Sequence, residues 1–200
     1  MTADLNQIAT ATLGRFLGSG FMAPTIQAFV RGQRVHGPAL TVRMPGIDDA
    51  ALIEALSIAR PGEVLVIDRC GDLRHSCFGE IAGQAAQERG IAGVVIDGFV
   101  ADQSALIELG LPIWCRGRSP MTTRNKRLSG EVGGLISCGG ATVAKGDIIL
   151  ADESGVVVLD PAEVDKLVEK ALRIQVQDRD ILQRLKQGET LREITLSLRG

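Results

Sequence analysis

The sequence predicts a single α/β domain over residues 1–200, with a mainly parallel sheet, a β-rich second half and a long C-terminal helix. Three features favour this fold. Strand and helix patterns alternate as far as residue 115, short glycine-separated β runs follow, and a periodic apolar pattern closes the chain. Apolar residues make up 45% of the 200 residues and charged residues 23%, a balance typical of one globular domain.

The first elements follow from local patterns. Apolar residues at roughly helical spacing predict an opening helix over Asn6–Phe16. The alternating, β-branched run ALTVRM predicts a strand at residues 39–44. Asp48 and Asp49 can cap a helix that continues to about Ala59, since aspartate oxygens accept bonds from the first helical N–H groups.

The next elements repeat the strand–helix order. The runs EVLVID (63–68) and GVVID (93–97) are nearly continuous apolar stretches of the kind covered on both faces. Between them we expect a polar loop and then a helix around Ile81–Arg89. Asp102 stands where the following helix starts, and residues 111–115 predict another strand. This alternation indicates parallel strands joined by helices.

The second half has a different pattern. Residues 130–159 hold short β runs between glycines, without a helical pattern, and predict a β-rich lobe. Pro161 suits the first turn of a final helix, which the apolar spacing extends over about residues 161–196. Because this helix is longer than a small domain readily covers, we expect it to pack on a neighbouring subunit.

The composition excludes some functional classes. A net charge of -2 gives no electrostatic reason to bind nucleic acid or an anionic membrane. No apolar run reaches the ~20 residues of a membrane span, and the N-terminus does not resemble a signal peptide. The four cysteines form no CxxC pair, so we expect reduced thiols in a cytoplasmic protein. Basic residues at 116–118 and 124–127 fit either a solvated loop or an anion-binding loop.

Common catalytic motifs are absent from the sequence. It contains neither the phosphate-binding pattern GxxxxGK[ST] nor the nucleophile pattern GxSxG. With only His36 and His75, a histidine-rich metal site is excluded. His75 lies in a polar loop, where it is either a site residue or an ordinary loop histidine.

Acids and glycines at strand ends form the remaining candidate site. Asp68 and Asp72 follow one predicted strand, and Asp97 and Asp102 follow the next. In parallel α/β sheets, ligands gather at the carboxyl ends of the strands. Carboxylates without imidazoles or paired thiols suit Mg²⁺ or Mn²⁺. Alternatively, Asp97 and Asp102 only cap helices and turn the chain.

A loop near these acids adds a second kind of donor. Gly79-Glu80 opens a predicted helix, whose first backbone N–H groups can hold a carboxylate. We therefore expect the site where the Gly79–Ala82 turn meets Asp102.

Several motifs, in order along nearly the whole chain, resemble the RraA-like family. They include GPALTVRMPGIDDA (37–50), RGIAGVVIDGFVAD (89–102), RGRSP (116–120) and GEVGGLISCGGATVAKGDIILADESGVVVLD (130–160). The family includes class II 4-hydroxy-4-methyl-2-oxoglutarate / 4-carboxy-4-hydroxy-2-oxoadipate aldolases. The resemblance implies a swivelling α/β/β fold, assembly as trimers or hexamers with sites between subunits, and a Mg²⁺ or Mn²⁺ cofactor. Its enzymes cleave 4-hydroxy-2-oxo acids to pyruvate, and many decarboxylate oxaloacetate.

The resemblance also assigns roles by position. Gly79, Glu80, Ile81 and Ala82 match the loop that binds the keto-acid carboxylate, and Asp102 matches the metal ligand. The implied chemistry is Lewis-acid polarisation of the 2-oxo group.

The chain departs from the family pattern at two positions. The substrate-binding arginine before Asp102 is replaced by Ala101, and Ala105 stands where the family has a further acid. Losing a positioned cation at a developing oxyanion typically costs ~3 kcal/mol. The substrate is therefore expected to differ from that of the named aldolases.

Other residues could supply what is missing. Arg74 is the candidate replacement for the arginine, because its loop leads into Gly79, and Arg69 and Arg116 are weaker candidates. Asp178 of a neighbouring C-terminal helix could add a carboxylate.

Two functions follow from these observations. The first is a divalent-metal-dependent lyase that acts on a small 2-oxo acid by retro-aldol cleavage or decarboxylation. The alternative is a non-catalytic protein that binds and inhibits the endoribonuclease RNase E, a known role in this family that does not need the missing arginine.

Overall fold

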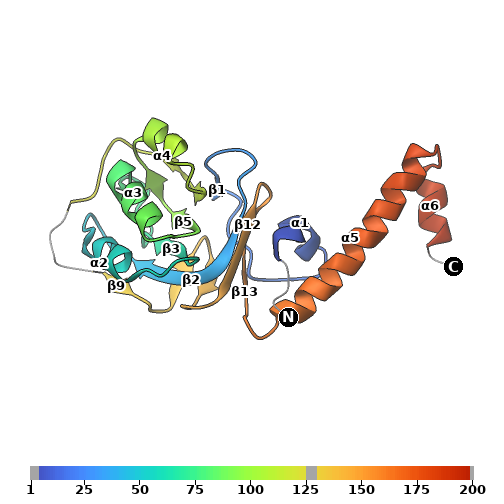
Figure 1. The fold of residues 1–200 in the computed structure, drawn as a ribbon, viewed down its shortest axis with the longest axis horizontal. Coiled ribbons are helices and arrows are strands. Elements are labelled where there is room, and N and C mark those ends of the chain that lie inside the picture. The colour runs from blue at the N-terminus through green and yellow to red at the C-terminus, as the bar shows by residue number, and fades with distance from the viewer. Residues whose placement is uncertain (1–4, 125–129, 199–200) are drawn as a thin grey trace.

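The computed structural model describes residues 5–124 and 130–198 and has a mixed α/β fold around one large sheet (Figure 1). Strand order in this sheet is β1 (Gln27–Ala28), β7 (Ile113–Cys115), β5 (Gly93–Asp97), β3 (Val64–Asp68), β2 (Val35–Arg43), β12 (Ile148–Asp152) and β13 (Gly155–Leu159), and β9 (Glu131–Val132) also pairs with β2. The four central strands β7, β5, β3 and β2 are parallel, and the flanking pairs are antiparallel. The predicted α/β class and its parallel sheet are thus confirmed.

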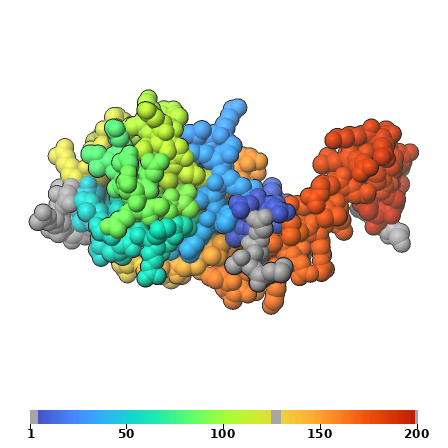
Figure 2. All heavy atoms as spheres, viewed as in Figure 1, coloured from blue at the N-terminus to red at the C-terminus, as the bar shows by residue number. Residues whose placement is uncertain are grey.

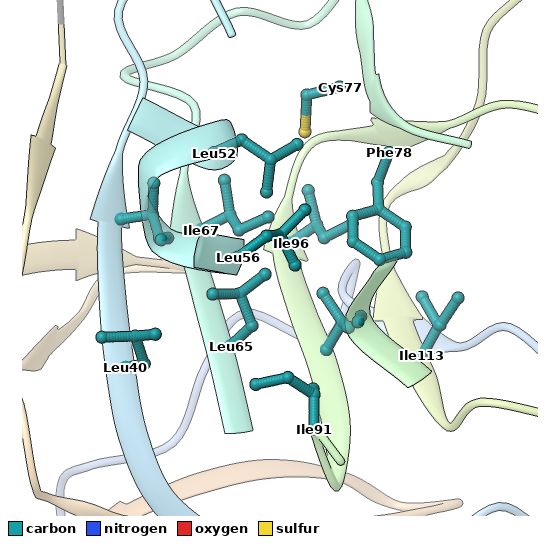
Figure 3. Close-up of a cluster of buried hydrophobic side chains, with 14 of the residues drawn as sticks. Leu40, Leu52, Leu56, Leu65, Ile67, Cys77, Phe78, Ile91, Ile96 and Ile113 are labelled. Carbon is teal, nitrogen blue, oxygen red and sulfur yellow. The ribbon is translucent and has the colours of Figure 1, made fainter. Parts of the chain in front are cut away.

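The central strands are covered on both faces, as their apolar runs predict. Leu65 and Ile67 of β3 lie in one cluster with Leu52 and Leu56 of α2 (Ala50–Ile58) (Figure 3). The same cluster includes residues of α3 (Glu80–Glu88) and α4 (Gln103–Leu109). Val64 and Val66 point to the other face and pack with residues of the hairpin β10 (Ile136–Cys138)–β11 (Ala141–Val143). Because side chains alternate along a strand, a run buried on both faces contains no polar position.

A small three-stranded sheet lies after the carboxyl ends of the central strands. Its parallel strands, in the order β4 (Ser76–Phe78), β6 (Phe99–Val100) and β8 (Gly117–Arg118), follow β3, β5 and β7 respectively along the chain. None of the three was predicted. Strands of two or three residues carry too little pattern to be identified, and only their partners hold them in place.

The opening helix is shorter than predicted. The expected helix over Asn6–Phe16 is replaced by a 3₁₀ turn at Leu5–Gln7 and by α1 (Thr10–Leu13). The start of α1 is fixed from far away, because the Thr10 N–H donates to the buried Asp152 carboxylate at 2.8 Å. A partner 142 residues away leaves no local sequence signal.

The predicted C-terminal helix over residues 161–196 is two helices, α5 (Val164–Lys186) and α6 (Leu191–Ser197). Pro161 precedes α5 by three residues instead of lying in its first turn. Gly188, with φ +96°, ends the helical path, and Thr190 starts α6 with a reciprocal capping box to Glu193. Gly188 and the Thr190–Glu193 pair are the physical reason for the break.

The beginning of α5 packs against the main body, and its later part contacts α6, whose Ile194 is buried. Val164, Val168 and Ala171 are buried against the segment that contains α1, whereas the remainder extends away from the main body with α6 (Figures 1 and 2). Packing of this extension on a neighbouring subunit stays a prediction. Within the described residues, no helix is long and apolar enough to cross a membrane.

Candidate functional site

The predicted site residues meet at the edge of the small sheet. Strand β4 leads through Gly79 into α3, and β6 leads through Ala101 and Asp102 into α4. These parallel strands are joined by a bond in which the Ala101 N–H donates to the Phe78 carbonyl at 2.9 Å. The fold therefore places Asp102 directly beside the N-terminus of α3.

Asp102 is held in an unusual conformation. Its φ is +52°, and Cys70 is the other non-glycine residue with positive φ in the described parts of the chain. This left-handed region is uncommon for residues with a side chain. The exposed Asp102 carboxylate does not cap its own helix; its Oδ2 accepts a bond from the Glu80 N–H of α3 at 3.0 Å.

Gly79 is required by this close approach. A Cβ at position 79 would lie 2.3 Å from Asp102 Oδ2, far inside van der Waals contact. The φ of −137° at Gly79 is accessible to any residue, so the carboxylate alone excludes a side chain there. Gly79 and Asp102 thus form one structural unit.

The start of α3 retains donors for an anion. The Glu80 N–H is bonded to Asp102, and the Gly83 N–H donates to the Gly79 carbonyl at 2.8 Å. The N–H groups of Ile81 and Ala82 lie in the first turn, where no carbonyl four residues earlier belongs to the helix. Two donors and the positive end of the helix dipole therefore lie next to the carboxylate.

Two open clefts meet at Ala101 and Asp102. The larger, of about 830 Å³, lies between α2 and α3 and has apolar walls that include Leu52, Leu56 and Ile81. Its charged lining is mainly acidic and consists of Asp49, Glu80, Glu88, Asp102 and Arg89. Burial, and then the neighbouring Asp48, raise the pKa of Asp49. The smaller cleft, of about 340 Å³, is lined by Asp102 and Arg118 as its charged residues.

Arg118 was not predicted as a site residue, although it belongs to a basic cluster noted in the sequence. It lies on β8 opposite Val100 of β6, and its guanidinium donates to the side chain of Gln103 in the first turn of α4. The sequence position of Arg118 is the signal that could identify it. Arg118 comes just after the strand predicted at 111–115, and that strand pairs with β5 in parallel.

Arg74, the predicted replacement for the missing arginine, is exposed and lines neither cleft. It contacts the site region through its backbone, since its carbonyl accepts the Ser119 hydroxyl at 2.6 Å. A role for its side chain stays a prediction.

The two weaker arginine candidates have structural partners. Arg116 Nε donates to Asp97, which also accepts the Gly139 N–H at 2.7 Å, so both Asp97 oxygens are engaged. Arg69 is fully buried and donates to the carbonyls of Met44 and Gly46 at 3.0 and 2.7 Å. Neither guanidinium lines either cleft.

Asp72 and His75 form a loop network with Arg69. Asp72 accepts bonds from Arg69, from the backbone N–H groups of Arg74 and His75, and from His75 Nδ1 at 2.9 Å. Burial by itself would raise the pKa of Asp72, but these hydrogen bonds outweigh it and lower the pKa below the usual 3.8. His75 is tied to this carboxylate and lines neither cleft, as expected of a loop histidine.

Three further predictions concern residues away from the clefts. Asp178 forms an ion pair with Arg15 of its own chain at 2.7 Å, and a contribution to a neighbour's site is untested. Asp68 accepts the Cys70 N–H at 2.6 Å. In the second basic cluster, the Arg124 N–H donates to the Ile47 carbonyl, and residues 125–127 lie outside the described part of the chain.

The donor set around Asp102 bears on metal binding. Across residues 5–124 and 130–198, no three His, Cys, Asp or Glu side chains are placed to hold a metal ion together. The cysteines are free thiols, and burial raises the pKa of Cys77 to about 12 and of Cys115 to about 11. These protonated thiols are poor ligands and nucleophiles. Asp102 is the carboxylate that lines both clefts, whereas Asp49, Glu80 and Glu88 line the larger one alone.

Comparison with known proteins places the chain in one family. The RraA-like family model, described as Aldolase/RraA, matches residues 3–158. A provisionally named 4-hydroxy-4-methyl-2-oxoglutarate aldolase of Halalkalibacterium halodurans is 34% identical over 78% of this chain and 74% of its own length. An uncharacterized protein from Pseudomonas syringae pv. tomato has a TM-score of 0.84 and 28% identity, over 98% of this chain and 92% of its own. Streptomyces coelicolor RraAS2, described as an unusual member of the RNase ES inhibitor RraA family, has a TM-score of 0.77 and 29% identity, over 88% and 91%.

Proposed function

Because this chain belongs to the RraA-like family, we propose that it is a divalent-metal-dependent lyase acting on a small 2-oxo acid. The observation that carries the proposal is the Asp102 carboxylate beside the N-terminus of α3, at the junction of two open clefts. A carboxylate and an anion-binding helix end are what a metal-assisted reaction of a 2-oxo acid requires side by side.

The residues at the junction fit Mg²⁺ or Mn²⁺. Only one oxygen of Asp102 is used by Glu80, so the other can contact a cation. Mg²⁺ keeps several waters and is commonly bound by one or two carboxylates plus substrate oxygens, so a single protein ligand is sufficient. When bound, such a cation supplies Lewis-acid polarisation of the 2-oxo group.

The chain's own groups orient the substrate. The N–H groups of Ile81 and Ala82 hold its carboxylate, and Asp102 fixes the reacting end next to them. In retro-aldol cleavage the 4-hydroxyl gives its proton to solvent water, its oxygen forms the C4 carbonyl of the second product, and the C3–C4 bond breaks. Its electron pair forms the enolate of pyruvate, which takes a proton at C3. In decarboxylation CO₂ leaves instead and the same enolate forms.

The larger cleft supports a substrate different from that of the named aldolases. Its walls are apolar and its charged lining is mainly acidic, and position 101 carries Ala in place of an arginine. A second carboxylate placed there would be repelled and poorly solvated. We propose a substrate whose substituent beyond the bond that breaks is uncharged.

The direct test is pyruvate release from oxaloacetate and from 4-hydroxy-4-methyl-2-oxoglutarate, with Mg²⁺ or Mn²⁺ and with EDTA. The same assay is applied to 4-hydroxy-2-oxo acids with a short alkyl chain at C4. Release that EDTA abolishes, and that is fastest with the alkyl substrates, is expected. No release from any of these compounds by a folded protein would overturn the proposal.

A second candidate function is binding and inhibition of an RNase E-type endoribonuclease. It is favoured by the description of the Streptomyces coelicolor relative and by exposed apolar residues on the C-terminal extension, among them Val176, Leu182 and Leu196. Inhibition of RNA cleavage by the purified chain, unchanged by Asp102→Ala, would support it. From the family we also propose a homotrimer or hexamer, which light scattering on the eluted protein measures.

A further inference from the structure

We propose that Arg118, on β8, is the cation that contacts the substrate in this site. It takes the role of the family arginine that is replaced by Ala101 in this chain. This inference rests on the proposed function and names the residue that would bind the developing negative charge. It replaces the sequence-based candidate, Arg74, with a residue that the fold brings to Asp102.

The pairing of β8 with β6 brings Arg118 close to Asp102. Arg118 is the register partner of Val100, and Ala101 and Asp102 are the next two residues on that strand's path. The pairing continues beyond Arg118, since the Ser119 N–H donates to the Val100 carbonyl at 3.0 Å. Arg118 and Asp102 therefore line the same cleft of about 340 Å³.

Arg118 supplies the positive charge of the smaller cleft. Among the described residues lining the smaller cleft, Arg118 is the base and Asp102 the acid. The other base near the junction, Arg89, lies at the far end of α3, roughly 13 Å along a helix of this length. Negative charge that develops on a substrate bound at Asp102 would thus meet the positive charge of Arg118 before that of Arg89.

The guanidinium of Arg118 is available to a ligand. Arg116 and Arg69 are ion-paired to Asp97 and Asp72, whereas the ion pairs found within the described residues do not include Arg118. The hydrogen-bond partner of Arg118 is Gln103, a neutral amide that orients the guanidinium without cancelling its charge. A guanidinium has five N–H donors, so this bond leaves others for a ligand.

A guanidinium suits the negative charge that develops in this reaction. The electron pair of the broken bond ends on the 2-oxo oxygen, and a charge-assisted hydrogen bond from a guanidinium stabilises that oxygen more in the transition state than in the substrate. A guanidinium has hydrogen-bond donors and no acceptor, so Arg118 suits a group that binds the developing oxyanion.

The experiment compares Arg118→Ala, Arg118→Lys and Arg74→Ala, with Arg60→Ala as a matched exposed arginine outside both clefts. With Mg²⁺ present, Arg118→Ala should lower kcat/KM for pyruvate release about a hundredfold, and Arg118→Lys should retain part of the rate. Ala101→Arg introduced into Arg118→Ala should restore at least tenfold, because it returns a cation to the same cleft.

A second readout does not depend on turnover. Oxalate, a planar dianion that mimics a pyruvate enolate, is titrated calorimetrically in the presence of Mg²⁺. Its Kd should rise at least tenfold in Arg118→Ala and stay unchanged in Arg60→Ala, with equal melting temperatures.

The outcomes separate the two proposals. Full rate and oxalate affinity in Arg118→Ala, with an active wild type, would overturn the role of Arg118 and leave the lyase intact; a hundredfold loss in Arg74→Ala instead would give the role to Arg74. Oxalate binding that depends on Arg118, without pyruvate release from any substrate, would support the cation and refute the reaction. A wild type that neither binds oxalate nor releases pyruvate would overturn both.

Discussion

Asp97 and Asp102 lie five residues apart, at the end of β5 and just after β6, yet their carboxylates are engaged to different degrees. Asp97 ends β5 and has both oxygens engaged, one by Arg116 and one by the Gly139 N–H at 2.7 Å. Asp102 uses one oxygen for the Glu80 N–H at 3.0 Å and faces two clefts. The difference shows that the fold leaves Asp102, and not Asp97, an oxygen available to a ligand.

The backbone explains why the two differ. Asp97 continues a regular strand and stays beside Asp68 in the register of the main sheet. Asp102 follows the short strand β6 and takes the left-handed conformation, which turns its carboxylate away from its own helix toward α3. The four predictions below test this division, beginning with the largest effect.

Removal of the open carboxylate should have the largest effect. Asp102→Ala is expected to lower metal-dependent pyruvate release at least a thousandfold, about 4 kcal/mol of transition-state stabilisation, because it removes the proposed cation ligand. Asp97→Ala should keep turnover per folded molecule within about tenfold. The measurement is kcat with saturating Mg²⁺, and wild-type turnover in Asp102→Ala would reject the site.

Removal of the engaged carboxylate should act on stability instead. Asp97→Ala leaves the Arg116 guanidinium and the Gly139 N–H without their acceptor, and both Arg116 and Asp97 have side chains that are less than a quarter exposed. We expect a loss of about 2–3 kcal/mol in the free energy of unfolding. Asp102→Ala removes the acceptor of the Glu80 N–H at the start of α3 and should lose about 1 kcal/mol. Urea unfolding curves measure both, and equal losses would contradict the comparison.

Crowding the open carboxylate should give an intermediate effect on activity. In Gly79→Ala the new methyl would overlap Asp102 Oδ2, so the carboxylate must rotate away from α3. We expect kcat/KM to fall about tenfold, or about 1.4 kcal/mol. Gly18→Ala, whose methyl meets nothing within 4 Å, is the control. Equal rates in the two variants would show that the position of the carboxylate is not critical.

The smallest effect on stability is expected at Asp72, whose two carboxylate oxygens also both accept hydrogen bonds. Its pKa is lowered in the folded state, so its contribution to stability is present above about pH 4 and is lost as pH falls through the folded-state pKa. Asp72→Asn should cost about 1 kcal/mol at pH 7 and nearly nothing at pH 2. Urea unfolding at the two pH values measures this, and a difference that grows toward low pH would contradict the sign.

Much of the fold was predictable because its signals are local. The apolar runs of β3 and β5 specify strands covered on both faces, and the starts of α3 and α4 were placed within one residue at Glu80 and Gln103. The C-terminal break was also visible locally, since Gly188 and the Thr190–Glu193 pair are ordinary signals of a helix end and a helix start. The apolar periodicity continues across these signals and by itself predicts one continuous helix.

The sequence by itself determined the α/β order, the Gly79–Ala82 turn and the place of Asp102 just before a helix, since strand runs, glycines and helix starts act within a few residues; the contact between Asp102 and the turn, 22 residues apart, needs the pairing of β4 with β6. Only the tertiary structure decided which acids are engaged and which arginine reaches the site. Asp97 is engaged by Arg116 and Gly139, 19 and 42 residues away, and Arg118 reaches the cleft through a two-residue strand pairing. Contacts of that kind depend on the register between distant segments, which no local pattern encodes.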